Sequence, residues 1–345
     1  MKMFLHALGT TLLLSIASSA SADPPKIVME EFMVSSPDPN IRLYVRNKHP
    51  ESLKAVPAEQ ILLFVHGATY PAETTFDLRL NGLSWMEYIA QRGYDVYLVD
   101  MPGYGRSTRP VEMDVPAEQN EPIVRSETEL QDVGAAVDFI LKRRKVQKLN
   151  LMGWSWGTVI MGWYTAQHND RVVKLVLGAP AWLGSLSPST DRGKLGAYDT
   201  ITREDAKAGW LADVPEYKKA DLIPAGWFEA WADATFTTDP VGAALVPPVL
   251  RAPLGYAADQ RELISAGKAL PYDPAEIRVP TFLVHAEWDF TKDMARSYFE
   301  KLVNTPYKRY VEIGEGTHFV LMEKNRIQLF QAVQQFLDEK SQIGQ

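Results

Sequence analysis

The segment Gly153-Trp154-Ser155-Trp156-Gly157 places a serine midway between two glycines. The apolar residues 149–152 before it suit a buried strand, and residues 156–168 after it have the three- and four-residue spacing of a helix. Small residues two positions away permit a sharp strand-to-helix turn that exposes the hydroxyl, and free N–H groups at the helix start favour negative charge nearby. Ser155 is therefore a candidate nucleophile for acyl transfer.

Two further segments extend this pattern. Phe64-Val65-His66-Gly67-Ala68 closes an apolar run, and Asp100–Ser107 reads Asp-Met-Pro-Gly-Tyr-Gly-Arg-Ser. With the serine turn, these segments resemble the oxyanion loop and the D-x-P-G-x-G-x-S turn of α/β hydrolases. The resemblance implies that the N–H groups of Ala68 and Trp156 form an oxyanion hole. It also implies that His66 orients its loop and takes no direct part in the chemistry.

A serine hydroxyl needs a base, and the base needs an acid to orient it. After the first 22 residues, only His318 lies in a loop between an expected strand, 310–313, and the expected last helix, 326–337. The resemblance implies a histidine in this loop, so His318 is the candidate base. Three other histidines have settings typical of loop, surface or packed residues: His49, His168 and His285.

Two acids follow the expected strand 281–284, within His285-Ala286-Glu287-Trp288-Asp289. This segment resembles the H-G-x-x-D of the same family with alanine in place of glycine, which implies Asp289 as the acid. Glu287 is the alternative. The acid fixes the histidine tautomer and stabilises the imidazolium without taking the proton.

Bringing these residues together requires strands that end at one edge of a sheet. Two alternating segments, 30–34 and 41–46, indicate a first antiparallel hairpin. Helical spacing is clearest at 126–144, with Ser126 as the expected N-cap. Short apolar runs suit strands buried on both faces of a parallel sheet: 61–65, 96–99, 149–152, 175–177 and 281–284. We therefore expect an α/β-hydrolase fold, a mostly parallel twisted sheet with helices on both faces and its chemistry at the carboxyl ends of the strands.

Residues 181–272 interrupt this alternation and show no clear strand. Their helical patches are rich in tryptophan, so we expect a helical cap inserted into a core domain of residues 23–180 and 273–345. A packing subdomain with no substrate role is the alternative. The side chains expected to line an apolar or aromatic pocket are Trp154, Trp182 and Trp288. The same rings would also suit simple packing between core and cap.

Composition limits the remaining function classes. The 345 residues are 46% hydrophobic and 23% charged, which suits a globular protein with a sizeable core. A net charge of −7 argues against a nucleic-acid partner, and the run Lys142–Lys145 is typical of a solvated helix end. The absence of cysteine excludes disulfides and Cys-ligated metals. We expect no metal or organic cofactor and leave the oligomeric state open.

The first 22 residues have the order of a secretory signal. Lys2 precedes an apolar stretch, Phe4–Ala17, and Ala20-Ser21-Ala22 offers a cleavage site before Asp23. The apolar stretch is shorter than the roughly 18 residues that a spanning helix needs, so cleavage after Ala22 is favoured over a retained anchor. We expect a periplasmic or secreted protein without stable membrane insertion.

The residues and the resemblance together imply hydrolysis of a small or medium carboxylic ester or lactone through an acyl-enzyme. A serine nucleophile argues against haloalkane dehalogenases and epoxide hydrolases, which use aspartate there. The serine turn is similar to that of proline iminopeptidases, but their H-G-G-P-G loop is replaced here by His66-Gly67-Ala68-Thr69-Tyr70. An aminopeptidase or a thioesterase, and more distantly a non-catalytic ligand-binding protein of this fold, are the alternatives.

Overall fold

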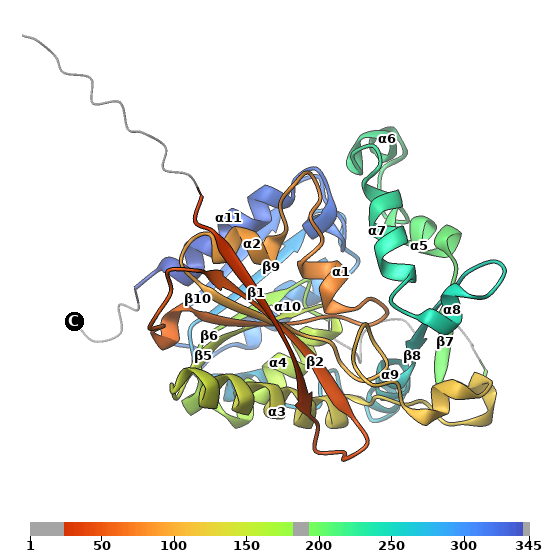
Figure 1. Cartoon of the computed structure of the whole chain (residues 1–345), viewed down its shortest axis with the longest axis horizontal. Helices are drawn as coiled ribbons and strands as arrows, with labels where there is room; N and C mark the ends of the chain where they lie inside the picture. The colour runs from red at the N-terminus through yellow and green to blue at the C-terminus, as the bar shows by residue number, and fades with distance from the viewer. Residues whose placement is uncertain (1–23, 182–192, 341–345) are drawn as a thin grey trace, which may run out of the picture.

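Eight strands form one sheet in the computed structural model, which describes residues 24–181 and 193–340. The order across the sheet is β1-β2-β4-β3-β5-β6-β9-β10 (Figure 1). β1 and β2 form an antiparallel hairpin, β2 is antiparallel to β4, and the strands from β4 to β10 run parallel, which confirms the expected sheet. The bounds are β1 (Ile27–Ser35), β2 (Arg42–Pro50), β3 (Ile61–Val65), β4 (Asp95–Val99), β5 (Leu149–Trp154), β6 (Val172–Gly178), β9 (Thr281–Ala286) and β10 (Lys308–Ile313).

Both faces of the sheet are buried. Successive side chains along a strand point to opposite faces. In β3, Leu62 and Phe64 belong to one hydrophobic cluster, whereas Ile61, Leu63 and Val65 belong to another on the opposite face. Because no position of such a strand faces water, every residue must be apolar, and this explains the continuous apolar runs in the sequence.

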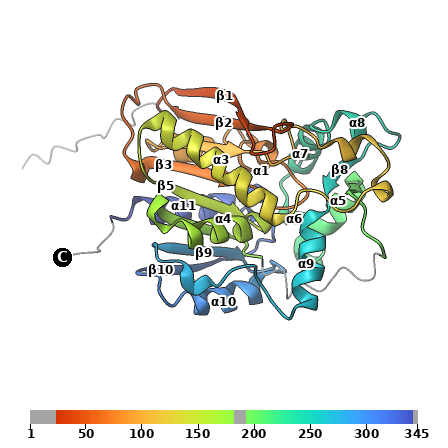
Figure 2. The same ribbon diagram turned by 90° about the horizontal axis from the view of Figure 1, so that it is seen from below.

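Helices cover the two faces (Figures 1 and 2). α1, α2 and α11 pack in the cluster that contains Trp85 and Phe330, and α3, α4 and α10 pack in the cluster that contains Tyr164 and Tyr298. The α-helices are α1 (Ala72–Phe76), α2 (Trp85–Ala90), α3 (Ser126–Arg144), α4 (Trp156–Gln167), α10 (Lys292–Lys301) and α11 (Arg326–Asp338). Short 3₁₀ turns lie in the connections: η1 (Ala58–Gln60), η2 (Val111–Asp114), η3 (Ala117–Gln119), η4 (Asn169–Arg171), η7 (Pro274–Glu276) and η8 (Val320–Met322).

The insertion between β6 and β9 contains a small sheet as well as helices. β7 (Tyr198–Ile201) pairs antiparallel with β8 (Leu250–Pro253), so the insertion contains two short strands where the sequence shows no clear strand. Each strand has only four residues, too few for a visible alternation. The helices are α5 (Arg203–Trp210), η6 (Glu216–Lys218), α6 (Lys219–Leu222), α7 (Trp227–Phe236), α8 (Pro240–Ala243) and α9 (Gly255–Ser265). This insertion lies beyond one end of the sheet in both views (Figures 1 and 2).

α3 has the expected bounds, but its N-cap residue differs from the expectation. Arg125 occupies the N-cap position and Ser126 is the first helical residue. The Ser126 hydroxyl accepts a hydrogen bond from Trp156 Nε1 at 2.8 Å, and the Ser126 N–H donates to Asp259 at 2.7 Å. A tertiary partner for the hydroxyl therefore replaces the local capping bond.

A buried carboxyl on α3 carries a testable cost for stability. Glu129 is fully buried, and neither carboxyl oxygen has a hydrogen-bond partner among the described residues. Burial, and then the nearby Asp132 and Asp259, raise the pKa of Glu129 well above its usual value. A raised pKa means that the folded state holds the proton more tightly than the unfolded chain. The contribution of Glu129 to the free energy of unfolding is therefore complete below the unfolded pKa of about 4.3. It decreases as the pH rises towards the pKa of the folded state.

We expect Glu129→Gln to stabilise the protein relative to wild type, and increasingly so from about pH 5 to about pH 8, by about 1 kcal/mol or more at the higher pH. Urea unfolding at both pH values measures the difference. The exposed Glu127 on the same helix provides the control, since Glu127→Gln should leave the pH dependence unchanged. Equal curves for Glu129→Gln and wild type would contradict the prediction.

The expectations about export concern the start of the chain. The expected signal segment, residues 1–22, lies outside the described residues. Among the residues that are described, no helix combines the length and the apolar character needed to cross a bilayer. Export therefore stays a prediction.

Candidate active site

Ser155 stands on a strained turn between β5 and α4. Its backbone has φ 54° and ψ −124°, a left-handed conformation that costs a non-glycine residue about 1–3 kcal/mol. The Ser155 N–H donates to the Gly178 carbonyl at 2.9 Å, which holds the turn against β6. A Cβ on Gly153 would lie 2.2 Å from the Gly157 carbonyl oxygen, and one on Gly157 would lie 2.4 Å from that of His66. Both glycines of the motif are thus required by close backbone contacts.

The loop after β3 touches this serine. A Cβ on Gly67 would lie only 2.7 Å from the Ser155 Cβ, so the loop backbone and the serine are in contact. Ala68 and Trp156 line the same pocket as Ser155. Trp156 is the first residue of α4. Its backbone N–H therefore has no acceptor within the helix, because the carbonyl that would accept it lies before the helix begins. The two residues predicted to form an oxyanion hole therefore line the same cavity as the serine.

His66 has a structural setting. Its Nε2 accepts the Met101 N–H at 3.0 Å, so Nδ1 carries the ring proton and donates to the Gly67 carbonyl at 2.7 Å. Burial lowers the pKa of His66 to about 4, although the bond to Gly67 opposes this shift. A neutral, doubly bonded ring fixes the orientation of the loop and leaves no free nitrogen for proton transfer.

His318 and Asp289 form a buried pair. The His318 Nδ1 and the Asp289 Oδ1 are 3.0 Å apart, and Oδ1 also accepts the N–H and the hydroxyl of Thr291 at 2.8 and 2.9 Å. Burial alone would raise the pKa of Asp289, but the interactions with His318 and Thr291 outweigh it and hold that pKa below its usual value. The carboxylate is therefore ionised at neutral pH, and Nδ1 is the protonated nitrogen that it orients.

The alternative acid lies elsewhere. Glu287 is exposed, and its Oε2 accepts the backbone N–H of Glu315 at 2.9 Å. His318 thus bonds to Asp289 and not to Glu287, because the loop after β9 turns the two side chains in different directions.

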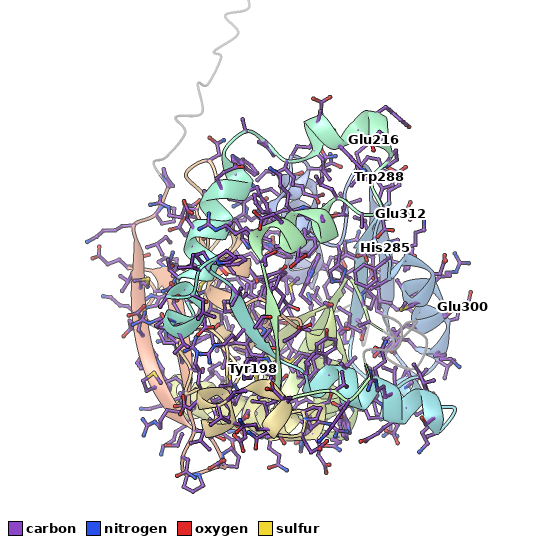
Figure 3. The ribbon with its side chains drawn as sticks, turned by 90° about the vertical axis from the view of Figure 1, so that its right-hand side faces the viewer. Tyr198, Glu216, His285, Trp288, Glu300 and Glu312 are labelled. Carbon is purple, nitrogen blue, oxygen red and sulfur yellow. The ribbon has the colours of Figure 1, made fainter. Side chains whose placement is uncertain are left out.

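The remaining histidines have partners away from the pocket. The buried His285 bonds through Nε2 to the Tyr310 hydroxyl at 2.6 Å, and it lies 3.7 Å from Glu312 (Figure 3). His49 faces Glu30 at 3.3 Å, and His168 packs against a tyrosine ring. None of these three residues lines the pocket that contains Ser155.

Ser155 and His318 open into one cavity of about 740 Å³. Aromatic, aliphatic and small residues from both the core and the insertion surround it. No Asp, Glu, Lys or Arg lines the cavity among the described residues, and this part of the chain holds no cluster of His, Cys, Asp or Glu suited to a metal ion. The core contributes Gly67, Ala68, Thr69, Tyr70, Thr75, Trp154, Trp156, Phe290, Met294, Phe319, Leu321 and Met322, and the insertion contributes Ala181, Ala206, Gly209, Tyr256 and Gln260.

The expected pocket tryptophans need one correction. Trp154 lines the cavity and donates from Nε1 to the His318 carbonyl at 3.1 Å. Trp288 is not among the residues that line it, whereas Phe290 lines it and has its ring 4.4 Å from the His318 ring. Trp182 lies outside the described residues. The sequence predicts an aromatic side chain of this loop in the pocket wall, but which ring faces the cavity depends on the turn at Asp289.

One further residue near the site, Glu323, is not recognisable from the sequence. This fully buried residue accepts hydrogen bonds from Thr317, just before His318, and from Trp210 in the insertion. Burial raises the pKa of Glu323 to about 7, although these donors oppose the shift. A glutamate five positions after a loop histidine gives no local signal of such a role, since both partners are recognised only in three dimensions.

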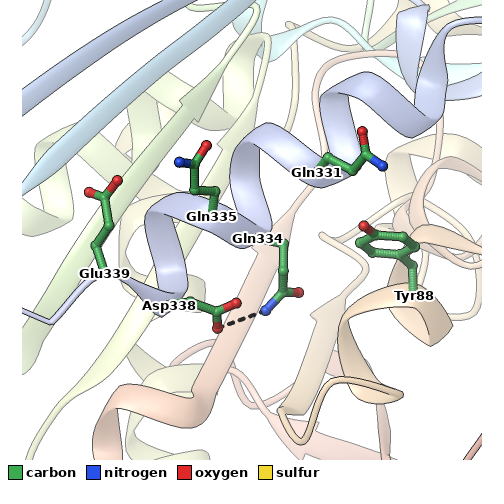
Figure 4. A pocket seen from close by; sticks show the side chains of 6 residues that line it. All are labelled: Tyr88, Gln331, Gln334, Gln335, Asp338 and Glu339. Atoms are coloured by element: carbon green, nitrogen blue, oxygen red, sulfur yellow. Dashed lines mark hydrogen bonds between the residues drawn. The ribbon is translucent and has the colours of Figure 1, made fainter. Parts of the chain in front are cut away.

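A second hollow lies away from Ser155, between α2 and α11. It is open to solvent, and Gln334 Nε2 donates to Asp338 at 2.9 Å along α11 at its edge (Figure 4). The residues that line it are Tyr88, Gln331, Gln334, Gln335, Asp338 and Glu339. It holds no nucleophile next to a base, so the chemistry belongs to the cavity at Ser155.

A mostly parallel sheet that places a strained serine turn and a buried histidine–aspartate pair at one edge is typical of an α/β-type hydrolase. The chain belongs to the α/β-hydrolase family, since the family model described as "alpha/beta hydrolase fold" matches residues 60–325. No curated protein matches the chain.

Solved structures show the same fold. A serine hydrolase involved in carbazole degradation is 18% identical, with a TM-score of 0.57 over 90% of this chain and 99% of that one. The enol-lactonase from Burkholderia xenovorans is 17% identical, with a TM-score of 0.55 over 90% and 100%. A thioesterase domain from the curacin biosynthetic pathway is 15% identical, with a TM-score of 0.52 over 90% and 99%. Identities this low show the fold alone.

Proposed function

We propose that this hydrolase is an exported serine hydrolase that cleaves a small or medium carboxylic ester or lactone through an acyl-enzyme. One observation carries the proposal. A strained Ser155 and a His318 already oriented by Asp289 share a cavity whose described lining is uncharged. That set of groups supplies the nucleophile, the base and the orienting acid of covalent catalysis in an apolar site.

The chemistry follows from the positions of these groups. Ser155 Oγ attacks the ester carbonyl carbon while His318 Nε2 takes the hydroxyl proton, and Asp289 stabilises the imidazolium through Nδ1–H. The Ala68 and Trp156 N–H groups stabilise the oxyanion. The imidazolium then gives its proton to the departing alkoxide, which leaves as the alcohol. Water, activated by His318, attacks the acyl group and releases the acid and free Ser155.

The lining of the cavity favours esters and lactones over the aminopeptidase alternative. A free terminal ammonium bound in an apolar site needs a carboxylate partner, because an unpaired buried charge is costly. No carboxylate lines the cavity among the described residues. The solved neighbours titled enol-lactonase and thioesterase keep lactone and thioester substrates in the proposal.

Covalent labelling tests this function. A fluorophosphonate probe should form an Oγ–P bond at Ser155 with loss of fluoride, and Ser155→Ala should remain unlabelled. A panel of nitrophenyl esters, lactones, thioesters and aminoacyl anilides should then show turnover of the first two classes and little of the anilides, with little activity on long-chain triglyceride emulsions. Wild-type protein that stays unlabelled would favour a non-catalytic ligand-binding role.

Export is tested by the N-terminus of the protein recovered from cells. We propose that the sequence is cut after Ala22, so that the exported form begins at Asp23. Recovery of the full-length chain from the cytoplasm alone would contradict this part of the proposal.

Gly209 offers a test of substrate size. It lines the cavity from α5, and a Cβ there would meet no atom within 4 Å. We expect Gly209→Phe to fill space in the cavity and lower kcat/KM for a large acyl ester by about tenfold or more, with an acetyl ester changed by less than about threefold. Gly209→Ala is the matched control and should leave both values close to wild type. An equal loss for both esters would show that the ring disturbs the catalytic groups instead of the substrate.

A further inference from the structure

A buried carboxylate joins the insertion to the loop that carries His318. Trp210, the last residue of α5, is buried and donates from Nε1 to Glu323 Oε1 at 2.7 Å. Glu323 follows η8 and is also fully buried. Because an unpaired donor or acceptor in such a place costs about 1–3 kcal/mol, each partner strongly favours the geometry in which the bond forms.

The same carboxylate holds the residue before His318. The Thr317 N–H donates to Glu323 Oε2 at 2.9 Å, and the Thr317 hydroxyl donates to Oε1 at 2.5 Å. That hydroxyl in turn accepts the Phe319 N–H at 3.1 Å, so the residues on both sides of His318 are fixed through one side chain. The backbone of His318 itself is held by the bond from Trp154 to its carbonyl.

Aromatic contacts also join the insertion to the loop that carries His318. The Trp210 ring lies 4.9 Å from the ring of Phe319, and Tyr70 lies 5.9 Å from Phe319 on the cavity side. α5 also contributes Ala206 and Gly209 to the cavity wall. A substrate that shifts α5, or holds it in place, therefore changes both the hydrogen bonds and the ring contacts of the loop that carries His318.

We propose that Trp210 and Glu323 are positioning residues. They couple the packing of α5 over the substrate to the alignment of His318 with Ser155. The inference rests on the proposed function, because it assigns a regulating contact to that same site. When α5 packs against the core, Glu323 accepts all three hydrogen bonds and the loop that carries His318 is held in place. When α5 moves away, the carboxylate loses the donor from Trp210 and the Phe319 ring loses its neighbour, so the histidine is less well aligned.

The test uses Trp210→Phe, which keeps an aromatic ring but removes the N–H, and Glu323→Gln, which keeps the side-chain shape but cannot accept from all three donors. With a nitrophenyl ester, we expect each variant to lower kcat and the rate of Ser155 phosphonylation by about 10- to 100-fold, because small misplacements of catalytic groups have effects of this size. KM should change by less than about threefold. The low-field proton signal of His318 Nδ1–H should broaden in both variants.

Lys218→Ala is the matched control. Lys218 in the insertion pairs with Glu315 of the same loop at 2.5 Å, but both side chains are partly exposed, and neither takes part in the Thr317 hydrogen bonds found among the described residues. It should stay within about twofold of wild type, because exposed ion pairs contribute little. The inference is overturned if Trp210→Phe and Glu323→Gln keep kcat within twofold of wild type, change only KM, or lose no more activity than Lys218→Ala. Unlabelled wild-type protein would instead reject the proposed function, so the two failures are distinguishable.

Discussion

Ser155→Ala should abolish turnover, with a loss of about four to six orders of magnitude in kcat and no loss of the fold. The reason is chemical: alanine has no nucleophile, so only the residual effect of the oxyanion donors and of substrate binding remains. Removing the hydroxyl leaves the backbone bond from the Ser155 N–H to Gly178 in place, so unfolding curves should stay close to those of wild type. Nitrophenyl ester kinetics, measured on protein checked by circular dichroism, give the result.

The companion variants show whether the serine acts within a unit. His318→Ala should cost about as much as Ser155→Ala, and the double variant should cost little more than either. The expectation follows because a serine without its base is as inert as a base without its serine. A Ser155→Ala protein that kept a tenth of wild-type activity would reject Ser155 as the nucleophile.

Asp289→Asn should lower kcat by about 10⁴ while leaving the geometry nearly intact. Asp289 accepts from His318 Nδ1 in a buried site, and asparagine can present its amide N–H to the ring instead. The imidazole then takes the tautomer that carries its proton on Nε2. A protonated Nε2 cannot accept the proton of the Ser155 hydroxyl. In the wild-type protein, the pKa of Asp289 is held below its usual value, so its carboxylate stays ionised. Titration of Asp289 should therefore cause no loss of activity between about pH 5 and pH 8.

Glu287→Gln is the matched control for this prediction. It removes a carboxylate from the same loop, but one that is exposed and bonds only to the Glu315 N–H among the described residues. The loss should stay below about tenfold, since a glutamine oxygen can accept the same bond. The reverse ranking of the two variants would transfer the role of the acid to Glu287.

Local features of the sequence determined most of the framework. The run at 61–65 and the helix at 126–144 have the bounds that the structure shows, because a strand buried on both faces and an amphipathic helix each leave a repeating apolar pattern. The turn at Ser155 was recognisable for a similar reason. Its strain, its glycines and the following helix all lie within one short segment, so the sequence contains the whole physical requirement.

Tertiary structure decided the features that join distant segments. The family resemblance implies Asp289 as the acid, but only the fold decides against Glu287 by bonding His318 to Asp289. The fold also places Phe290 instead of Trp288 at the cavity, because the directions of a loop's side chains depend on what packs against them. The pairing of β7 with β8 and the bond between Trp210 and Glu323 join residues far apart in the chain. Neither contact has a local periodicity to reveal it. The two strands meet only when the insertion folds back on itself, and the bond from Trp210 to Glu323 forms only when the insertion packs on the core and removes water from both partners.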